Sequence, residues 1–458
     1  MTFPRSSLSF FLVASLTACG RLVDVPFDPG PPINATPSTT ATAAALLLVA
    51  QDGDTLVVMS IDPATATARR FGPALPAVAS HYAAAEVQAS PDGLHAIVAL
   101  SPSSPVGEAV PDDRPALALA GDGASWRVIA SGGPLLDLGA VVSPDASTLW
   151  TARLCNATDY VGPAQHELLS FSGTSLWKDD TCRQSNTFSP VALARDGSLV
   201  AFVDASSVNV LTSATGKVSS VPTSSSASSV IATFPTSTVV AMNDRTVAWL
   251  DADGQALTVP GASTDAAAVV DPGHHITGPA GLYQVAGGAL SVLHDRAVER
   301  IQSVPAGVGP NDVYGHLPGR YAIVGLPGGS LALVGTDGAV LTKRAAPPRD
   351  GRVGATGVSA HSFAGRWPWV VLTTNYLVPG TDIGDIDSVE ELWLPGDPST
   401  GVPAQSHALR SGTNLTSRSY FASADGEHAL YLENGQLHCV DIATMADNIV
   451  RKDLVWYE

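Results

Sequence analysis

The feature that most constrains the fold is a short strand–turn–strand unit that recurs along the chain. In each copy an apolar segment runs into a turn built around Asp-Gly, and a second apolar segment follows. Proline presets φ at the first central position of such a turn, aspartate caps it, and glycine adopts the positive φ that closes it. The unit predicts an all-β chain of many short antiparallel strands. Clear copies occupy 85–100, 139–154, 190–204 and 420–442, and weaker copies occupy 46–62, 248–259 and 332–343.

The spacing of the copies indicates a larger repeat. The turn residues Asp92, Asp145 and Asp196 lie 53 and 51 residues apart. Each interval also contains two further strand candidates, which makes about four strands per interval, the composition of one propeller blade. These candidates are Ala116–Ala120, Trp126–Ala130, Glu167–Phe171, Ser175–Lys178, Val208–Thr212 and Lys217–Val221. Only 14% of residues are charged, whereas amphipathic helices need a charged outer face. The best helical candidate is Ser388–Leu392.

The SPDG unit, complete at 90–93, resembles the WD40-like repeats of TolB-type and related bacterial propellers. In those families the motif joins the first two strands of a blade. The resemblance covers about 43–458 and implies a single β-propeller domain, without implying a TolB function. We expect about eight four-stranded blades, with seven as the alternative. Because Ala43–Arg70 contains only three strands, strands from both termini are expected to complete one blade and close the ring. The stretch 261–330 has no good copy of the motif.

Connections longer than a simple turn interrupt this pattern at two places, Ser101–Arg114 and Leu377–Glu391. Long loops on a rigid scaffold are where binding residues often lie. We therefore expect these two loops to be candidates for functional contacts.

The N-terminal 20 residues have the layout of a secretory signal peptide. One cation, Arg5, precedes an apolar run from Leu8 to Leu16, and small residues follow. This run is too short to span a bilayer as a helix. We therefore expect the chain to be exported.

The residues that end this segment are more specific. LTAC at 16–19 resembles the lipobox of bacterial lipoproteins, in which the chain is cut before the cysteine and the thiol carries a diacylglyceryl group. The resemblance implies a signal peptide at 1–18 and a lipid on Cys19, and Gly20 in place of aspartate favours the outer membrane. A plain signal peptide that contains a cysteine is the alternative. The Pro/Thr-rich segment that follows, 19–42, is expected to be a flexible tether.

The charge of the chain limits its partners. The net charge is −18, and an acidic surface repels phosphate backbones, so nucleic acid is not expected as a partner. The same charge disfavours a broad contact with anionic lipid. We expect membrane contact only through the lipid on Cys19.

Three cysteines remain after Cys19. Cys155 and Cys182 lie 27 residues apart within one predicted blade. A disulfide between them is expected in an exported protein, where closing this loop would stabilise the fold by ~3–4 kcal/mol in the chain-entropy model. Two unpaired thiols at strand ends are the alternative. Cys439 lies in an apolar run and is expected to be buried.

Two groups of residues could bind a metal ion. Oxygen ligands for calcium are offered by Asp382, Asp385, Asp387, Glu390 and Glu391, although the segment lacks the EF-hand spacing. A solvated acidic loop is the simpler interpretation. The pair His274-His275 follows a Pro-Gly turn and is interpreted as exposed. Because HExxH and CxxC are also absent from the sequence, we predict no metal and no cofactor.

No motif in the sequence predicts a catalytic residue. GxSxG is absent, and the segment 143–150 resembles the sialidase Asp box, a structural turn even in that family. Trp367 and Trp369, near Phe363 and Tyr376, could stack on a ligand, but aromatic residues in strands more often belong to the core.

Two functions remain open. The favoured one is a non-catalytic, lipid-anchored module of the cell envelope that binds a protein, peptide or glycan. The alternative is an envelope hydrolase or lyase whose active site lies in the central channel of the propeller, built by residues from several blades. Ionisable side chains that converge on that channel would favour the enzyme.

Overall fold

The structure is a computed structural model that describes most of the chain after residue 45. The described residues are 46–62, 67–90, 92–103, 116–132, 141–155, 164–180, 182, 191–203, 207–222, 227–242, 244–269, 282–317, 319–327, 329–345, 354–362, 368–377, 386–396, 401–413, 420–423, 426–433, 435–452 and 454–457. The expected signal peptide (1–18), the tether (19–42) and Cys19 lie outside them. Within them, no helix is long and apolar enough to cross a membrane.

The described residues form nine antiparallel sheets, which we number in chain order. Sheet 1 has the strand order β3-β2-β1-β34, and the other sheets each consist of consecutive strands. The strands of sheets 1 to 4 are β1 (Leu46–Asp52), β2 (Thr55–Asp62), β3 (Thr67–Arg70) and β34 (Val455–Tyr457); β4 (Tyr82–Ala89), β5 (Ala96–Pro102), β6 (Leu117–Gly121) and β7 (Trp126–Ser131); β8 (Val141–Val142), β9 (Thr148–Leu154), β10 (Ala164–Ser170) and β11 (Ser175–Lys178); and β12 (Val191–Leu193), β13 (Leu199–Val203), β14 (Ser207–Thr212) and β15 (Lys217–Pro222).

Sheets 5 and 6 have three strands each, and sheets 7 to 9 have four. Their strands are β16 (Ala227–Thr233), β17 (Ser237–Met242) and β18 (Val247–Asp251); β19 (Leu282–Ala286), β20 (Ala289–His294) and β21 (Ala297–Ser303); β22 (Val313–Leu317), β23 (Tyr321–Leu326), β24 (Ser330–Gly335) and β25 (Val340–Arg344); β26 (Ala355–Ser362), β27 (Trp369–Leu377), β28 (Ile386–Leu394) and β29 (Gln405–Thr413); and β30 (Tyr420–Ala422), β31 (His428–Glu433), β32 (Gln436–Asp441) and β33 (Asp447–Arg451).

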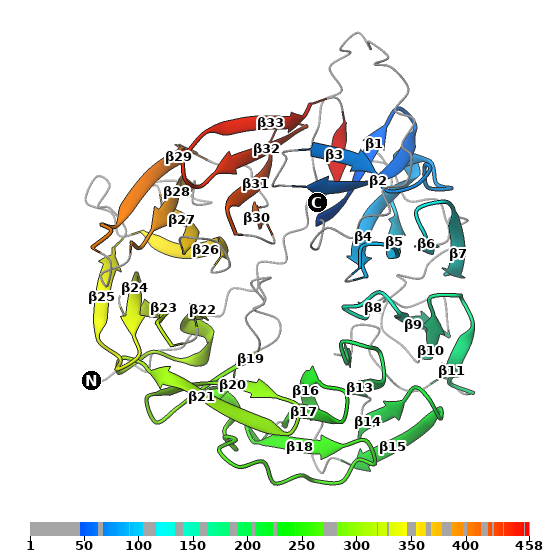
Figure 1. The fold of residues 1–458 in the computed structure, drawn as a ribbon. Helices are drawn as coiled ribbons and strands as arrows, with labels where there is room; N and C mark the ends of the chain where they lie inside the picture. Colours follow the sequence, from blue (N-terminus) through cyan, green and yellow to red (C-terminus); the bar gives the residue numbers. More distant parts are fainter. Residues whose placement is uncertain are drawn as a thin grey trace.

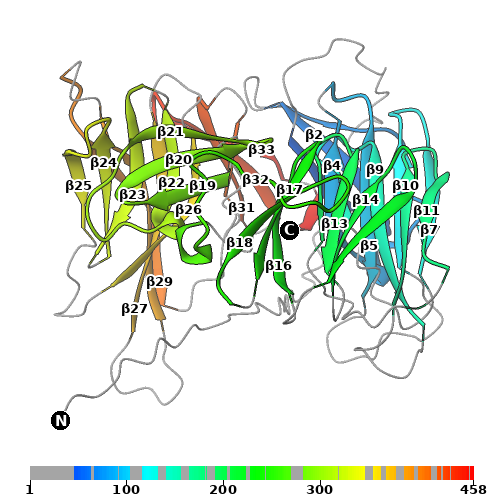
Figure 2. The same ribbon diagram turned by 90° about the horizontal axis from the view of Figure 1, so that it is seen from below.

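The sheets follow one another in chain order around a common centre (Figure 1). In most sheets the first strand lies nearest the centre and the last strand lies at the rim. Middle strands such as β13 and β24 are buried along their whole length, whereas rim strands such as β15 and β25 are largely exposed. This pattern fits the low share of charged residues, because the middle strands of the sheets are shielded from water. Figure 2 shows the same ring from the side, with the strands running across its thickness.

The two ends of the described chain meet in sheet 1. The C-terminal strand β34 pairs with β1, with Val49 opposite Tyr457 and Gln51 opposite Val455. Sheet 1 therefore obtains its fourth strand from the opposite end of the chain, as the sequence predicted for one blade.

Nine apolar clusters hold the sheets together, and each cluster lies between two consecutive sheets. Between sheets 4 and 5, for example, Val210 packs in one cluster with Val240. The cluster that contains Met59 and Leu430 joins sheet 1 to sheet 9. The core is thus divided into nine parts rather than gathered in one centre, as expected when each repeat buries its faces against its neighbours.

The Asp-Gly turns lie where the resemblance predicted them in sheets 2, 3, 4 and 9, between the first and second strands. In the turn after β4, Ser90 Oγ and the Leu94 amide both donate to Asp92 Oδ1, and these bonds lower the pKa of Asp92. In the turn after β8, Ala146 adopts φ +55°, the conformation that glycine adopts in the other copies. The weaker copies lie elsewhere in their sheets, between β1 and β2, after β18, and between β24 and β25.

One expectation about the fold is not confirmed, and another is wrong. The estimate of eight blades is not confirmed, because the described residues form nine sheets. The stretch without a good motif copy, 261–330, contains all of sheet 6, and the isolated bridges Leu250–Ala256 and Val269–Gln284 involve residues of the two three-stranded sheets. The helical candidate Ser388–Leu392 is wrong, since these residues belong to β28, which pairs with both β27 and β29. The predicted long loop Leu377–Glu391 therefore begins and ends within strands.

Candidate binding site between sheets 8 and 9

The interface between sheets 8 and 9 contains a network of paired ionisable side chains. Glu390 on β28 is only 3% exposed. Arg410 on β29 binds it with two hydrogen bonds, from Nε to Oε2 at 2.7 Å and from Nη2 to Oε1 at 2.8 Å. Tyr420 of sheet 9 donates its hydroxyl to Oε2 at 2.5 Å. This carboxylate is fully satisfied by donors from two sheets, so it fixes the sheets relative to each other.

A second polar group lies on the side of sheet 9. The Tyr431 hydroxyl donates to Asp447 Oδ2 at 2.5 Å, and His438 Nδ1 lies 3.1 Å from Asp447 Oδ1. The rings of Tyr431 and His438 stack at a centroid distance of 4.6 Å, and the Tyr420 ring lies 5.5 Å from that of Tyr431. The wall of the interface is therefore held in place by hydrogen bonds as well as by apolar contact.

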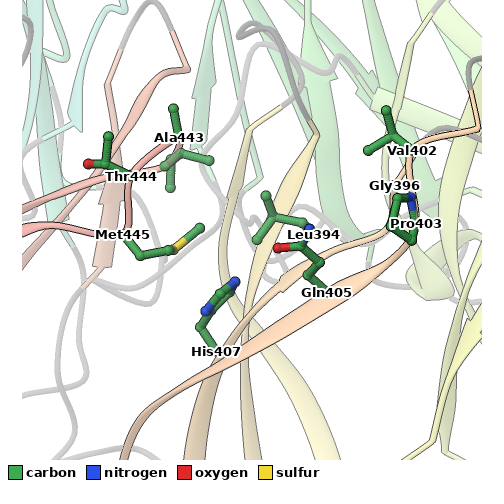
Figure 3. Close-up of a pocket in the computed structure, with 10 residues that line it drawn as sticks. Leu394, Gly396, Val402, Pro403, Gln405, His407, Ala443, Thr444 and Met445 are labelled. Carbon is green, nitrogen blue, oxygen red and sulfur yellow. The ribbon is translucent and has the colours of Figure 1, made fainter.

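Toward the rim the same interface opens into a cleft of about 420 Å³, the size of a small ligand pocket (Figure 3). We call it the 8/9 cleft. One side is formed by residues of β28, β29 and the segment that joins them, and the other side by residues that follow β32. The lining consists of Leu394, Gly396, Val402, Pro403, Gln405, His407, Ile442, Ala443, Thr444 and Met445. Most of these side chains are apolar, and none of them is acidic.

The sheet 9 side of the 8/9 cleft is a rigid turn. Asp441 Oδ1 accepts hydrogen bonds from the backbone N and the hydroxyl of Thr444, at 2.7 and 2.9 Å. These bonds stabilise the ionised carboxylate and thereby lower the pKa of Asp441. Met445 is held at φ +57°, a left-handed conformation that is strained for a side chain of this size. Such strain persists only where the surroundings fix it, and it is concentrated at functional sites.

The sheet 8 side depends on one glycine. Gly396 has φ +76°, and a Cβ there would collide with the Val402 carbonyl and lie 2.7 Å from the Pro403 carbonyl carbon. Only glycine allows the segment after β28 to fold back this closely against 402–404. The close approach shapes the end of the cleft that Val402 and Pro403 line.

His407 is the chemically distinctive residue of the cleft. Its side chain points between the Met445 and Gln405 side chains in Figure 3. Its Nε2 atom is buried yet has no hydrogen-bond partner in the described part of the chain. An unsatisfied buried polar atom costs roughly 1–3 kcal/mol, and natural proteins retain few of them. A bound group that reached Nε2 through a rotation of the His407 ring would remove that cost.

The residues predicted from sequence lie in different places. Cys155 and Cys182 form a disulfide, with Cα atoms 6.2 Å apart, and Cys439 is a buried free thiol. Trp369 and Tyr376 are fully buried core residues, and the Trp369 indole donates to the Gly426 carbonyl, so neither offers a stacking surface. Trp367, Phe363 and the His274-His275 pair lie outside the described residues.

The candidate calcium ligands do not form a site in the described chain. Asp382 and Asp385 lie outside the described residues. Glu390 is occupied by Arg410 and Tyr420, and Glu391 forms a bidentate ion pair with Arg344 of sheet 7. No cluster of His, Cys, Asp or Glu suited to a metal ion occurs among the residues that the structure places.

Sequence reasoning missed His407 and Met445. The two residues lie 38 positions apart on different sheets, and neither belongs to a recognisable motif. Only the packing of sheet 8 against sheet 9 brings them together. The one local signal that the sequence offers nearby is the capping pair Asp441 and Thr444, which indicates a turn rather than a binding site.

Comparison with known proteins adds no named relative. No protein-family profile and no curated protein matches the sequence. Among solved structures, the chain is similar to a eukaryotic initiation factor, at 12% identity and a TM-score of 0.46 over 91% of this chain and 98% of that chain. It is also similar to the WD40 domain of SCAP from fission yeast, at 10% identity and a TM-score of 0.34 over 69% and 86% of the two chains.

A third similar structure is dipeptidyl peptidase 4 of Porphyromonas gingivalis, at 9% identity and a TM-score of 0.41. The match covers 90% of this chain and 60% of the peptidase. At these identities and TM-scores, no activity or partner of the three proteins is transferred to this chain. Its own nine sheets, arranged around a common centre, define the class of protein as a β-propeller.

Proposed function

We propose that this chain is a non-catalytic binding module of a bacterial cell envelope, held on a membrane by a lipid on Cys19. In this proposal the propeller presents the 8/9 cleft to a protein, peptide or glycan partner. The observation that carries the proposal is the buried Nε2 of His407, which has no partner within the described residues although it lines a cleft of about 420 Å³. A group of a partner that pairs with Nε2 gains an interaction that water does not supply there.

The scaffold suits this role because it is rigid. We take the nine sheets as nine blades of one closed ring, in which β34 completes the first blade. The cluster between sheets 9 and 1 and the β1–β34 pairing support this closure. A ring in which each blade is clamped by two neighbours keeps the walls of a cleft in fixed positions, so binding requires little ordering.

The anchor is supported by the sequence. LTAC at 16–19 fits a lipobox, and the Pro/Thr-rich segment 19–42 would separate the propeller from the lipid surface. Two or three acyl chains on one residue anchor a protein stably, whereas one chain binds marginally. The outer membrane is the favoured location because Gly20 follows the cysteine.

The anchor is tested by the intact mass of the protein extracted from membranes, compared between the natural chain and Cys19→Ala. The expected result is a species that begins at residue 19 and carries two or three acyl chains, and that is lost in the variant. An unmodified chain cleaved at another position would overturn the anchored module.

The binding role is tested by photo-crosslinking in intact cells. A photoreactive residue replaces Gln405 in the 8/9 cleft or, as the control, Lys217 on the exposed rim strand β15. A crosslinked partner is expected from position 405 only, and it should disappear when His407→Leu is added. Equal crosslinking from both positions would contradict a role for the cleft.

A further inference from the structure

The rim strand β29 differs from the rim strands of the other sheets. It comprises nine residues, Gln405–Thr413, whereas the rim strands β7, β15 and β25 comprise six, six and five. β29 is the last strand of its sheet and pairs only with β28 among the described strands. Its outer edge thus presents a row of backbone N–H and C=O groups, which is a template for another extended segment.

Natural proteins usually protect such an edge with exposed charged side chains. The shorter rim strands follow this rule, with Arg127 on β7, Lys217 on β15 and Lys343 on β25. In β29 the only Lys, Arg, Asp or Glu is Arg410, and it is turned inward onto Glu390. The exposed residues of β29 are uncharged: Gln405, Ser406, Ala408 and Ser411.

The 8/9 cleft lies beside the first half of this edge. A register shift at Leu409 divides β29, because Glu390 opposes Arg410 while Glu391 opposes Ala408. The regular half, Gln405–Ala408, contributes both Gln405 and His407 to the cleft. Since side chains alternate along a strand, every second side chain of a segment added to this half would face the cleft.

We propose that the partner binds as an extended peptide segment that adds to the outer edge of β29 along Gln405–Ala408. One apolar side chain of the peptide occupies the cleft against Leu394 and Met445, and a polar group of the peptide pairs with His407 Nε2. The main chain supplies affinity and the cleft supplies selectivity, as in other cases of β-strand addition. The net charge of −18 favours a neutral or basic segment. This inference rests on the proposed binding function and specifies its ligand.

The test begins with random decapeptides selected for binding to the full-length chain purified in detergent. The probe is the tightest selected peptide, together with a series in which each backbone nitrogen is methylated in turn. Strand addition uses only every second N–H of the peptide, so methylation should weaken binding about tenfold at alternate positions and little at the others. His407→Leu should weaken binding about tenfold as well. The control is Leu341→Ala on the rim strand β25, whose side chain is exposed, and it should leave the affinity unchanged.

Three results would overturn the inference: no selected peptide binds, binding is insensitive to alternate methylation, or His407→Leu and Leu341→Ala have equal effects. If the Gln405 crosslink nevertheless captures a glycan, the binding module stands and only the peptide inference fails. If peptides bind at β29 while Cys19 carries no lipid, the edge site stands and the anchored function fails.

Discussion

The interfaces between sheets 3 and 4 and between sheets 8 and 9 each contain a histidine close to aromatic or apolar partners. The two histidines differ in the hydrogen-bond partners of their ring nitrogens. Between sheets 3 and 4, His166 stacks on Trp150 at 5.2 Å, and its Nδ1 lies 3.1 Å from Asp179 Oδ2. Trp177 and Phe202 complete this aromatic cluster. Between sheets 8 and 9, His407 lines an open cleft, and its buried Nε2 has no partner among the described residues.

This difference separates residues that serve the fold from residues available for binding. A buried polar group that is fully paired adds rigidity, and its loss damages the protein. A buried polar group without a partner costs stability, and replacing it with an apolar side chain costs little or nothing. Stability measurements on matched variants at the two interfaces can therefore contradict or strengthen the assignment of the 8/9 cleft.

The largest effect is expected from Trp150→Ala. Trp150 is 2% exposed, and its removal leaves a cavity among the three rings of His166, Trp177 and Phe202, so the free energy of unfolding should fall by ~3–5 kcal/mol. Urea denaturation measures this loss. Trp177→Ala serves as the control, since Trp177 is only half-buried and should cost clearly less. Equal losses in the two variants would show that Trp150 contributes no more to the stability of this interface than Trp177 does.

A third histidine, His361 on β26 of sheet 8, makes the stability of the fold depend on pH. Burial lowers the pKa of His361 to about 4, from a usual value of 6.5. Between these two values the unfolded chain binds the proton and the folded chain does not, so stability falls as pH falls. The loss reaches up to about 3 kcal/mol by pH 4.

His361→Leu should flatten this part of the stability profile, measured by urea denaturation between pH 7 and pH 4.5. The capping carboxylates Asp92 and Asp441 have lowered pKa values, so their contributions are lost only below this window. An unchanged profile in the variant would assign the acid sensitivity to other groups.

Asp179→Ala should reduce the free energy of unfolding by ~2–3 kcal/mol, because the buried ring of His166 loses its carboxylate partner. Asp179→Asn keeps an acceptor oxygen near Nδ1 and should cost less. Thermal unfolding of the two variants measures the difference. The same loss in both would show that the hydrogen bond does not contribute.

A smaller effect on the free energy of unfolding is expected at the turn between β12 and β13 of sheet 4, which contacts sheet 3. Gly197 has φ +64°, and a Cβ there would collide with the Thr148 side chain of β9. Gly93 has φ +68° but open space around it. Gly93→Ala should cost about 1 kcal/mol from the left-handed backbone alone, and Gly197→Ala about 2 kcal/mol. Equal costs in denaturant titrations would mean that Thr148 moves freely.

The smallest effect on stability is expected at the 8/9 cleft. His407→Leu should change the free energy of unfolding by less than about 0.5 kcal/mol, although His407 is partly buried. His166→Leu at the sealed interface should cost more, because the Asp179 carboxylate would lose its contact with His166 Nδ1. If His407→Leu proved as damaging as His166→Leu, the cleft would be structural and the proposed binding site would be wrong.

The sequence by itself determined the strands and the turns that join them. The period of two in apolar residues and the Asp-Gly turns are local features, so segments such as Ser175–Lys178 and the turn at Asp92 were predicted in place. The low charge and the repeat spacing likewise determined the class of fold. Each of these signals acts between residues close in the chain, and a sequence displays such neighbours directly.

Only the tertiary structure decided how many sheets form and which side chains meet. Sheet 6 forms in the stretch without a good copy of the motif, and its strands pair in the same antiparallel order as those of the other sheets. Residues 388–392 could form either a helical turn or a strand locally, and pairing with β27 and β29 selected the strand. His407 and Met445 share a cleft because sheets 8 and 9 are held together by Glu390, Arg410 and Tyr420. Contacts of this kind depend on how separate sheets pack, and no local pattern encodes that packing.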